Sequence, residues 1–405
     1  MASVPRVAYI LSQELAQVSS LLPSNRGRSG LVHTLANSYE LFKPENGRCV
    51  VVRPRKVERK ELERYHEKGY LDHILQPHEG DEAKAERVQE IASMFGLEDD
   101  CPVFPGINDY VLLVAGATLT AAQAVQTGRF DAAICWDGGR HHAHKGHAAG
   151  FCYVADCVLG VHVSACQRGR DRTVEPSAAP STVLTLSIHH HTPGFYPHSA
   201  LGSLTRSYTS DPFALSIPLA RGTSAASFAR IWPIVEGVAT AFFGWSDVST
   251  EMETDEDQGV HSGSRPTYVV VQCGVDGLAG DPHAIWNWNI DAKTDGSIGW
   301  CVKRVMHWVR ERTGLKAVFL GGGGYNSPNA ARAWAYLTSI ITGEPFSIDA
   351  DIPDHAAFLQ YAPSFILDVP AGNMRDENTE EEFGRIESTF KVLIERITHA
   401  QSQQK

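Results

Sequence analysis

Short apolar segments alternate with longer helical segments along this chain, and this alternation restricts the fold more than any other feature. Runs typical of buried strands are Val7–Leu11, Cys49–Val52, Ala132–Trp136, Val183–Ile188, Tyr268–Cys273 and Ala317–Leu320. Strands that alternate with helices favour a parallel sheet covered on both faces. We therefore predict an α/β fold, a three-layer sandwich with a mainly parallel central sheet. Its active site is expected at the carboxyl ends of the strands.

Three helices have recognisable ends in the sequence. The apolar-rich stretch Val111–Gln126 is stopped by Gly128, and a helix at Asn329–Thr342 is predicted to begin with Ser327 as N-cap and Pro328 as its first residue. Thr379 and Glu382 have the spacing of a capping box. The helix that follows them repeats apolar residues at helical spacing: Phe383, Ile386, Phe390, Leu393 and Ile397.

We expect one main domain, residues 1–375, followed by a C-terminal helix and tail, residues 376–405. Residues 246–265 are polar, acidic and without apolar periodicity, and we predict a flexible surface insertion there.

The net charge of −11 argues against a protein that binds nucleic acid phosphates, and it favours basic partners such as lysine-rich peptides. Eight cysteines include no Cys-x-x-Cys pair, which indicates reduced thiols in an intracellular protein. Neither a signal peptide nor an apolar run of about 18 residues is apparent. We expect a soluble protein of the nucleus, the cytoplasm or both, without membrane attachment.

Four strand endings carry residues with chemical potential. They are His141–His142, Asp276 after the strand ending at Cys273, Tyr325 after four glycines, and the three histidines 189–191. Each has an ordinary alternative: a surface histidine pair, a turn aspartate, a phosphate-binding glycine loop, or histidines on alternate faces of a strand. The glycine run lacks the Lys-Ser/Thr of a P-loop, which argues against phosphate binding.

The order and the residues of these motifs resemble those of class I of the zinc-dependent histone deacetylases, in the arginase/deacetylase superfamily. The motifs that carry the resemblance are DCP (100–102), GATLTAAQAV (116–125), RHHA (140–143), GFCYVAD (150–156), PGFYP (193–197), GVDGLAGDP (274–282), GGGGYN (321–326) and DIPDH (351–355). The similarity runs from the first strand to about residue 370, so residues 1–375 correspond to a deacetylase catalytic domain.

The resemblance implies a hydrolase that removes the acetyl group from acetyl-lysine with one catalytic Zn²⁺. His142 is then the general base and later the acid for the leaving amine, with His141 assisting it. Tyr325 donates its phenol to the developing oxyanion. Asp276 is one zinc ligand.

Substrate contacts follow from the same resemblance. Phe151 and Tyr196 are the aromatic walls beside the lysine methylenes, and Tyr196 stands where relatives usually have phenylalanine. Gly150 lines the tunnel with its backbone, and Asp100 binds substrate amides at the rim. The implied partners are acetylated lysines in histone tails or other proteins and a corepressor complex, with acetylated polyamines as the alternative substrate. A structural K⁺ near Ser187 is also implied.

The chain departs from the family in one place. The family's other zinc ligands lie in an Asp-x-Asp-x-His-His-Gly-Asp-Gly stretch, but residues 161–182 offer only His162 and Asp171, at the wrong spacing. About a dozen residues are absent, including the carboxylates that orient His141 and His142. Aligning Ser187–His189 with the missing ligands is disfavoured, because PGFYP follows and places that strand later in the fold.

Three explanations remain open at this point. The sequence is a faulty or spliced version of an active enzyme, the protein is a non-catalytic relative that binds acyl-lysine or partner proteins, or zinc ligation is rebuilt from histidines 189–191. For all three, we predict that residues 161–182 form the least regular part of the core, and that His142, Asp276 and Tyr325 surround one pocket.

Overall fold

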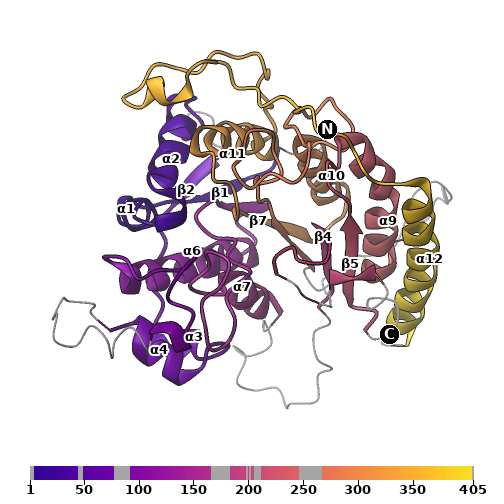
Figure 1. Ribbon diagram of the computed structural model, residues 1–405, viewed down its shortest axis with the longest axis horizontal. Helices are drawn as coiled ribbons and strands as arrows, with labels where there is room; N and C mark the ends of the chain where they lie inside the picture. Colours follow the sequence, from indigo (N-terminus) through magenta and orange to yellow (C-terminus); the bar gives the residue numbers. More distant parts are fainter. Residues whose placement is uncertain are drawn as a thin grey trace, which may run out of the picture.

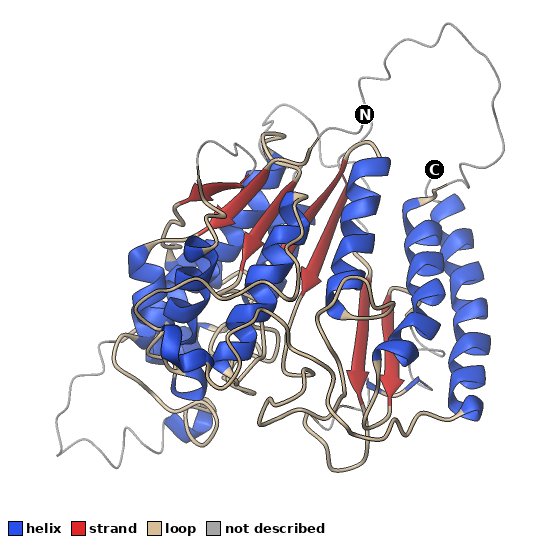
Figure 2. Ribbon diagram, turned by 90° about the horizontal axis from the view of Figure 1, so that it is seen from above, coloured by secondary structure: helices blue, strands red, loops and turns tan. Residues whose placement is uncertain are grey.

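The computed structural model describes residues 4–43, 49–76, 92–165, 183–197, 199, 202–204, 211–245 and 267–403. A parallel sheet of five strands in the order β2-β1-β3-β7-β6 forms its centre, and a separate parallel pair β4-β5 lies beside it (Figure 2). The five strands are β1 Val7–Ile10, β2 Cys49–Val52, β3 Ala132–Cys135, β6 Thr267–Gln272 and β7 Leu315–Leu320. The pair consists of β4 Thr185–His190 and β5 Ala214–Leu219.

Helices cover both faces of the sheet (Figure 1). The shorter ones are α1 Gln13–Ser19, α2 Arg28–Ser38, α3 Arg59–Leu62, α4 Lys68–Ile74 and α7 Asp156–Ala165, with 3-10 turns at Pro23–Asn25 and Phe358–Tyr361. The longer ones are α6 Ile107–Gln126, α9 Ala225–Phe243, α10 Ile298–Glu311, α11 Ser327–Thr342 and α12 Glu380–Ser402.

Alternation of side chains along the strands gives the three layers. Tyr9 and Phe319 pack into one core with α2, α9, α10, α11 and α12, whereas Ile10 and Leu320 pack into a second core with α4 and α6. Successive side chains of a strand point to opposite faces, so strands buried on both faces are apolar throughout. The predicted fold class is therefore confirmed.

Element boundaries agree with the sequence predictions to within a few residues, with one wrong cap. The N-cap of α11 is Asn326, whose side-chain oxygen accepts from the N–H of Asn329, and not Ser327 as predicted. Ser327 is the first residue of the helix and Pro328 is the second. The first turn tolerates proline, because its N–H groups have no partner within the helix. The expectation for residues 246–265 lies outside the described residues.

Residues 161–182 can be compared with their prediction only in part. Residues 161–165 are the last residues of α7, so this portion is regular and the prediction is wrong for it. Residues 166–182 lie outside the described part of the chain.

The C-terminal helix α12 begins at the capping box that the sequence predicted. Thr379 and Glu382 exchange side-chain to backbone hydrogen bonds at its start. Its predicted apolar residues are all buried and belong to the larger core: Phe383, Ile386, Phe390, Leu393 and Ile397.

Truncation of this apolar face is expected to destabilise the protein. Leu393→Ala removes a fully buried side chain and should lower the free energy of unfolding by about 2–5 kcal/mol. Val392→Ala is the matched control, because Val392 is exposed and its loss should change stability by less than about 0.5 kcal/mol. Urea unfolding of both variants measures the difference, and equal losses would contradict the assigned packing of α12.

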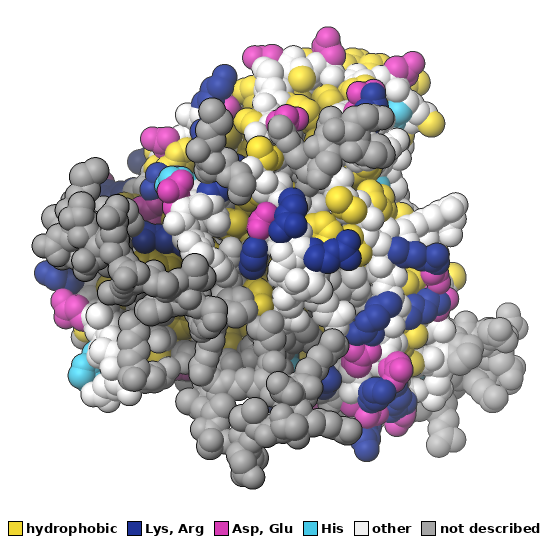
Figure 3. Space-filling view, turned by 180° about the vertical axis from the view of Figure 1, so that it is seen from behind, with side chains coloured by type: hydrophobic (Ala, Val, Ile, Leu, Met, Phe, Trp, Pro, Cys, Tyr) yellow, Lys and Arg dark blue, Asp and Glu magenta, His cyan; other side chains and the backbone are white. Residues whose placement is uncertain are grey.

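The described surface carries charges of both signs. On the face seen in Figure 3, Lys and Arg side chains lie among Asp and Glu side chains. None of the helices in the described ranges is long and apolar enough to cross a membrane.

Candidate active site

Three loops that follow neighbouring strands meet at one edge of the sheet. They follow β3, β7 and β6, which are adjacent in the sheet. Backbone bonds join the strand ends: Gly321 donates to Cys135, and Cys273 donates to Leu320. Because all three strands are parallel, their carboxyl ends place these loops side by side.

The loop after β3 is held by a buried carboxylate. Asp156, the first residue of α7, accepts from the N–H of Gly139 at 2.9 Å and from that of Arg140 at 2.7 Å. The hydroxyl of Thr118 on α6 also donates to Asp156. These bonds fix the backbone immediately before His141 and His142.

The two histidines are neighbours in space, with ring centroids 4.1 Å apart. His141 is exposed, and its Nδ1 lies 3.3 Å from the carbonyl oxygen of Gly139. His142 is half-buried, and burial together with His141 and His144 lowers its pKa to about 3. His142 is therefore neutral at pH 7, which is the state a general base requires.

The loops after β6 and β7 interlock at Asp276. A Cβ on Gly323 would lie 2.3 Å from a carboxylate oxygen of Asp276, so only glycine fits there. Burial and the neighbouring Asp281 raise the pKa of Asp276. Burial and the charge of Asp276 also raise the pKa of Tyr325, which keeps this phenol protonated and able to donate.

Two charged side chains position the glycine loop that carries Tyr325. Asp281 accepts from the backbone N–H of Tyr325 at 2.5 Å and of Asn326 at 3.0 Å. On the other side, Arg28 at the start of α2 donates to the carbonyls of Gly322 and Gly324 at 3.0 and 2.7 Å. The phenol is thus held through its backbone from two directions.

Aromatic rings line the approach to these groups. The ring of Phe151 lies 5.1 Å from that of Tyr325, and the ring of Tyr196 lies 5.0 Å from that of His142. A Cβ on Gly150, whose φ is +55°, would lie 2.6 Å from the Tyr196 hydroxyl and 2.7 Å from Cγ of His142. Asp100 Oδ2 accepts from the N–H of Gly150 at 2.9 Å. The structure thus gathers all eight predicted site residues, while their roles stay predictions.

The last two residues of β4, His189 and His190, have other partners. His189 Nδ1 lies 2.9 Å from the Ser187 hydroxyl and its Nε2 lies 2.9 Å from the carbonyl of Gly202. His190 has partners at both ring nitrogens too, the carbonyl of Leu219 and the hydroxyl of Thr192. A metal at either imidazole would have to displace such a contact.

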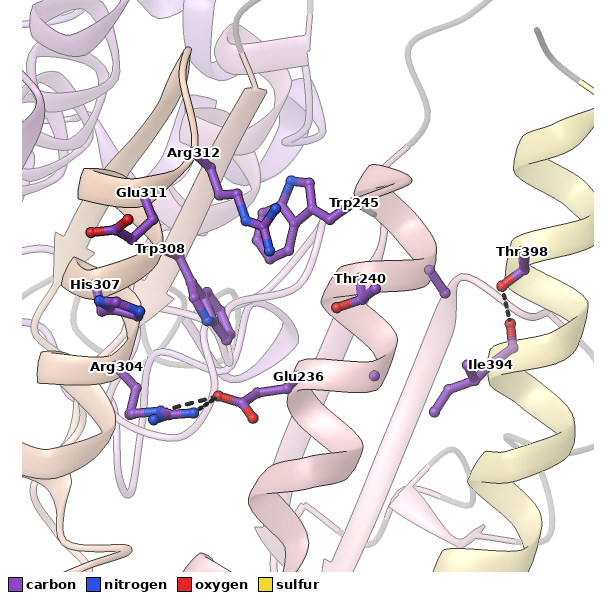
Figure 4. Close-up of a pocket in the computed structure, with 12 residues that line it drawn as sticks. Glu236, Thr240, Trp245, Arg304, His307, Trp308, Glu311, Arg312, Ile394 and Thr398 are labelled. Atoms are coloured by element: carbon purple, nitrogen blue, oxygen red, sulfur yellow. Dashed lines mark hydrogen bonds and ion pairs between the residues drawn. The ribbon is translucent and has the colours of Figure 1, made fainter. Parts of the chain in front are cut away.

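A separate cavity of about 520 Å³ lies between α9, α10 and α12 (Figure 4). Trp245, Trp308 and Arg312 line one side of it, and an ion pair between Arg304 and Glu236 lies on another. None of the predicted site residues lines this cavity.

Three residues that hold the loops of the site were not identified from the sequence: Asp156, Asp281 and Arg28. Asp156 ends the motif GFCYVAD, and Asp281 precedes the proline of the motif GVDGLAGDP. The sequence therefore shows an acidic residue in each motif but gives it no role. Their partners lie on other elements, and nothing local indicates those contacts.

Removing the carboxylate of Asp156 tests its part in holding the histidine loop. Asp156→Ala leaves two buried amides without an acceptor and should lower the free energy of unfolding by about 2–4 kcal/mol. Asp109→Ala is the control, because Asp109 makes only a half-exposed ion pair with Lys56 and its loss should cost less than about 1 kcal/mol. Chemical denaturation of both variants is the measurement, and a loss below 1 kcal/mol for Asp156→Ala would contradict the assignment.

Comparison with known proteins agrees with this geometry. The histone deacetylase domain matches residues 22–175 and 170–341, two stretches that meet inside the connection between α7 and β4. Histone deacetylase 8 of Xenopus tropicalis is 32% identical over 402 residues, covering 96% of this chain and 98% of that protein. Histone deacetylase 8 of Danio rerio is 32% identical over 403 residues, with 96% of each chain covered.

More distant relatives carry the same name. Histone deacetylase clr6 of Schizosaccharomyces pombe is 27% identical over 394 residues, covering 94% of this chain and 87% of that protein. With a matched domain over most of the chain and near full-length similarity to deacetylases, the chain belongs to the class I histone deacetylase family of lysine-deacetylating hydrolases.

Proposed function

We propose that the pocket binds the acetyl-lysine side chain of histones or other proteins and that hydrolysis of its amide requires Zn²⁺. The observation that carries the proposal is the meeting of His142, Tyr325 and Phe151 at the carboxyl ends of adjacent strands. Phe151 beside Tyr325 and Tyr196 beside His142 are the aromatic side chains that would contact the lysine methylenes. Asp100 at the rim suits recognition of substrate amides.

The acid–base and oxyanion groups suit amide hydrolysis. His142 is uncharged at neutral pH and can take a proton from water, and His141 beside it can share the positive charge that results. Tyr325 stays protonated and can donate to an oxyanion as it forms. Together these groups cover proton transfer and charge stabilisation.

The residues that the structure describes do not fit a complete zinc site. Asp276 is the one family ligand among them, and no group of three His, Cys, Asp or Glu side chains in these ranges could hold a metal ion. Catalytic zinc is normally held by three protein ligands. We therefore infer that the chain, with the sequence given, holds zinc weakly.

A binding protein for acetylated lysine is the second candidate. The groups that would contact the acetyl-lysine are in place, whereas the predicted metal ligands are reduced to Asp276. Zinc content by elemental analysis, measured beside acetyl-lysine peptide binding by calorimetry, separates the candidates. Binding without zinc or turnover supports the binding protein. Stoichiometric zinc with turnover supports the enzyme.

We propose acetylated protein lysine over acetylated polyamines, a place in the nucleus and cytoplasm, and a role in chromatin and transcription regulation within a corepressor complex. Competition between an acetyl-lysine peptide and N-acetylspermidine decides the substrate class. Imaging of the tagged full chain decides the compartment, and co-purification from nuclear extract tests the complex. The K⁺ near Ser187 is tested by the dependence of stability on KCl against NaCl.

A methyl group at Gly150 should weaken peptide binding. Gly150→Ala places a methyl group against His142 and Tyr196, and we expect it to weaken acetyl-lysine peptide binding at least about tenfold. Gly128→Ala is matched for positive φ (+71°) but meets nothing within 4 Å, so binding should be unchanged. Calorimetric titration of both variants with the same peptide is the measurement. Equal affinities would contradict the placement of the substrate beside Gly150.

A further inference from the structure

Among the described residues, the guanidinium of Arg140 is a buried cation without a counter-ion. Arg140 is 3% exposed, and its Nε is enclosed with no hydrogen-bond partner in this part of the chain. The only hydrogen bond that Arg140 donates there comes from its backbone N–H. A buried charge is costly unless it is paired. Arg140 therefore indicates a ligand of opposite charge.

The buried carboxylates closest to Arg140 in this loop and in α7 have other partners. Asp156 accepts from the backbone N–H groups of Gly139 and Arg140. Asp137 Oδ2 lies 2.9 Å from Nε2 of the buried His33. Where the structure describes the chain, neither carboxylate forms an ion pair with the guanidinium. The protein's own acids thus leave this cation unpaired.

Other buried arginines in the described ranges have structural partners. Arg28 donates to two carbonyls of the glycine loop before Tyr325. Arg332 donates to the carbonyls of Tyr361 and Ile366. These guanidinium groups hold loops in place, which is a common reason to bury one. The side chain of Arg140 holds no such loop, so its burial needs a different reason.

Tyr110 on α6 is a second buried group of this kind. It is fully buried, and its hydroxyl has no hydrogen-bond partner among the residues that the structure describes. Burial raises the pKa of this phenol, so it stays protonated and can donate. Tyr110 and Arg140 act on each other through their charges, which places them near one another. Two groups that offer only donors suit an anion.

These two groups lie behind the candidate acyl-lysine site. Arg140 directly precedes His141, and its charge acts on Tyr325 and Cys152. Cys152 follows Phe151, whose ring lies 5.1 Å from that of Tyr325. Phe151 and Tyr325 are half-buried whereas Arg140 is buried, so the guanidinium lies deeper. We therefore expect the far end of an acyl group bound at Tyr325 to approach Arg140.

A second guanidinium makes this region more positive. Burial and the charge of Arg140 lower the pKa of Arg28 to about 10. Arg28 also lies over the ring of Trp334, at 4.8 Å from its centroid, and is fixed there by its bonds to the glycine loop. Like charges disfavour each other's charged form, and an anion bound near both relieves this repulsion.

We propose that Arg140 and Tyr110 bind the terminal carboxylate of an acidic acyl group, so that the pocket prefers succinyl-lysine to acetyl-lysine. The inference rests on the proposed binding of acyl-lysine and narrows it to one class of acyl group. An acetyl group ends in a methyl, which leaves the guanidinium and the phenol unpaired. A carboxylate accepts from both. Arg140 is thus a residue that determines acyl specificity.

Calorimetric titration of the full chain with three peptides of one sequence tests this preference. The peptides carry acetyl-lysine, succinyl-lysine, or the carboxamide of succinyl-lysine, which has the shape of the succinyl group without its charge. We expect the succinyl peptide to bind at least about tenfold more tightly than either of the others, because only its carboxylate neutralises the buried cation.

Arg140→Met removes the charge and keeps an apolar side chain of similar length. It should reduce the affinity for the succinyl peptide to that for the carboxamide, and it should change the affinity for the acetyl peptide by less than about threefold. Arg129→Met is the control, because Arg129 is exposed and lies over the ring of Phe130, outside the pocket. Its affinity for all three peptides should equal that of the unmodified chain.

Thermal unfolding without peptide separates a role in specificity from a structural role. Arg140→Met should melt at or above the temperature of the unmodified chain, because it removes an unpaired buried charge. A structural guanidinium such as Arg332 should show the opposite, since Arg332→Met frees buried carbonyls. A lower melting temperature for Arg140→Met, with an unchanged preference for the succinyl peptide, would assign Arg140 to structure and overturn the proposal.

The unmodified chain alone also decides the matter. Equal affinities for the succinyl peptide and its carboxamide would overturn the proposal without any variant. If the acetyl peptide binds and the succinyl peptide binds no better, the proposed function stands and this inference falls. If the succinyl peptide binds and the acetyl peptide does not, this inference stands and acetyl-lysine is the wrong ligand. Binding of no peptide contradicts both.

Discussion

Inserting a family-like Asp-x-Asp-x-His segment after Gly160 is expected to raise zinc content from well below one ion to about one ion per chain. Turnover of an acetyl-lysine peptide should rise with it, by at least about a hundredfold. The reason is ligand number: Asp276 alone cannot anchor the ion, and the insert supplies an aspartate and a histidine. Elemental analysis and a fluorogenic acetyl-lysine assay on both chains measure the two effects.

A matched insert distinguishes the effect of the added segment from the effect of its zinc ligands. An Asn-x-Asn-x-Gln version has the same length and similar side-chain shapes, but its neutral amides are poor zinc ligands. It should leave zinc content and turnover near those of the unmodified chain. Stoichiometric zinc and robust turnover in the unmodified chain would overturn the argument. His191 would then be the leading ligand, since both ring nitrogens of His189 and of His190 have other partners.

The position of β6 at the end of the five-stranded sheet makes this insertion physically reasonable. A parallel strand added beside β6 would end at the same edge of the sheet as β6. Its carboxyl end would then emerge near Asp276, which follows β6. One segment would therefore extend the sheet and add side chains to the pocket. The amide-containing insert tests this, because it has the length of the segment without its zinc ligands.

The elements that sequence predicted best are those whose burial is local and periodic. Phe390 and Leu393 follow from helical spacing, and the strand Cys49–Val52 agrees with its prediction residue for residue. The positions of His142, Asp276 and Tyr325 followed from a general property of parallel sheets, namely that strand ends meet at one edge. These inferences need no knowledge of which strands are neighbours.

What sequence could not predict depends on strand order and on distant partners. The bonds from Arg28 to Gly322 and Gly324 span almost 300 positions, and the strand β5 was not predicted at all. The split of the sheet was not predicted either, because the sequence of an apolar strand such as β4 does not show whether it pairs with one neighbouring strand or with two. The sequence indicated a missing segment, and among the described residues β6 pairs with β7 alone and β4 with β5 alone.

Within the chain that carries the Asp-x-Asp-x-His insert, Tyr325→Phe is expected to lower turnover by about two to three orders of magnitude, as loss of one oxyanion donor does elsewhere. The phenol stays protonated because burial and Asp276 raise its pKa, so it is a donor throughout the neutral range. Its backbone is held by Asp281, and phenylalanine keeps the ring contact with Phe151. The substitution therefore removes a hydrogen bond and little else.

The split between kcat and KM identifies where that hydrogen bond acts. A donor that engages the oxyanion only as it forms lowers kcat and kcat/KM together and leaves KM nearly unchanged. Tyr39→Phe is the control, because its hydroxyl bonds to the carbonyl of Asp351 outside the pocket, and turnover should stay within about twofold. A rise in KM at constant kcat would instead assign Tyr325 to ground-state binding. In that case the oxyanion donor would have to be sought among the other polar groups beside Asp276, with His141 the first to test.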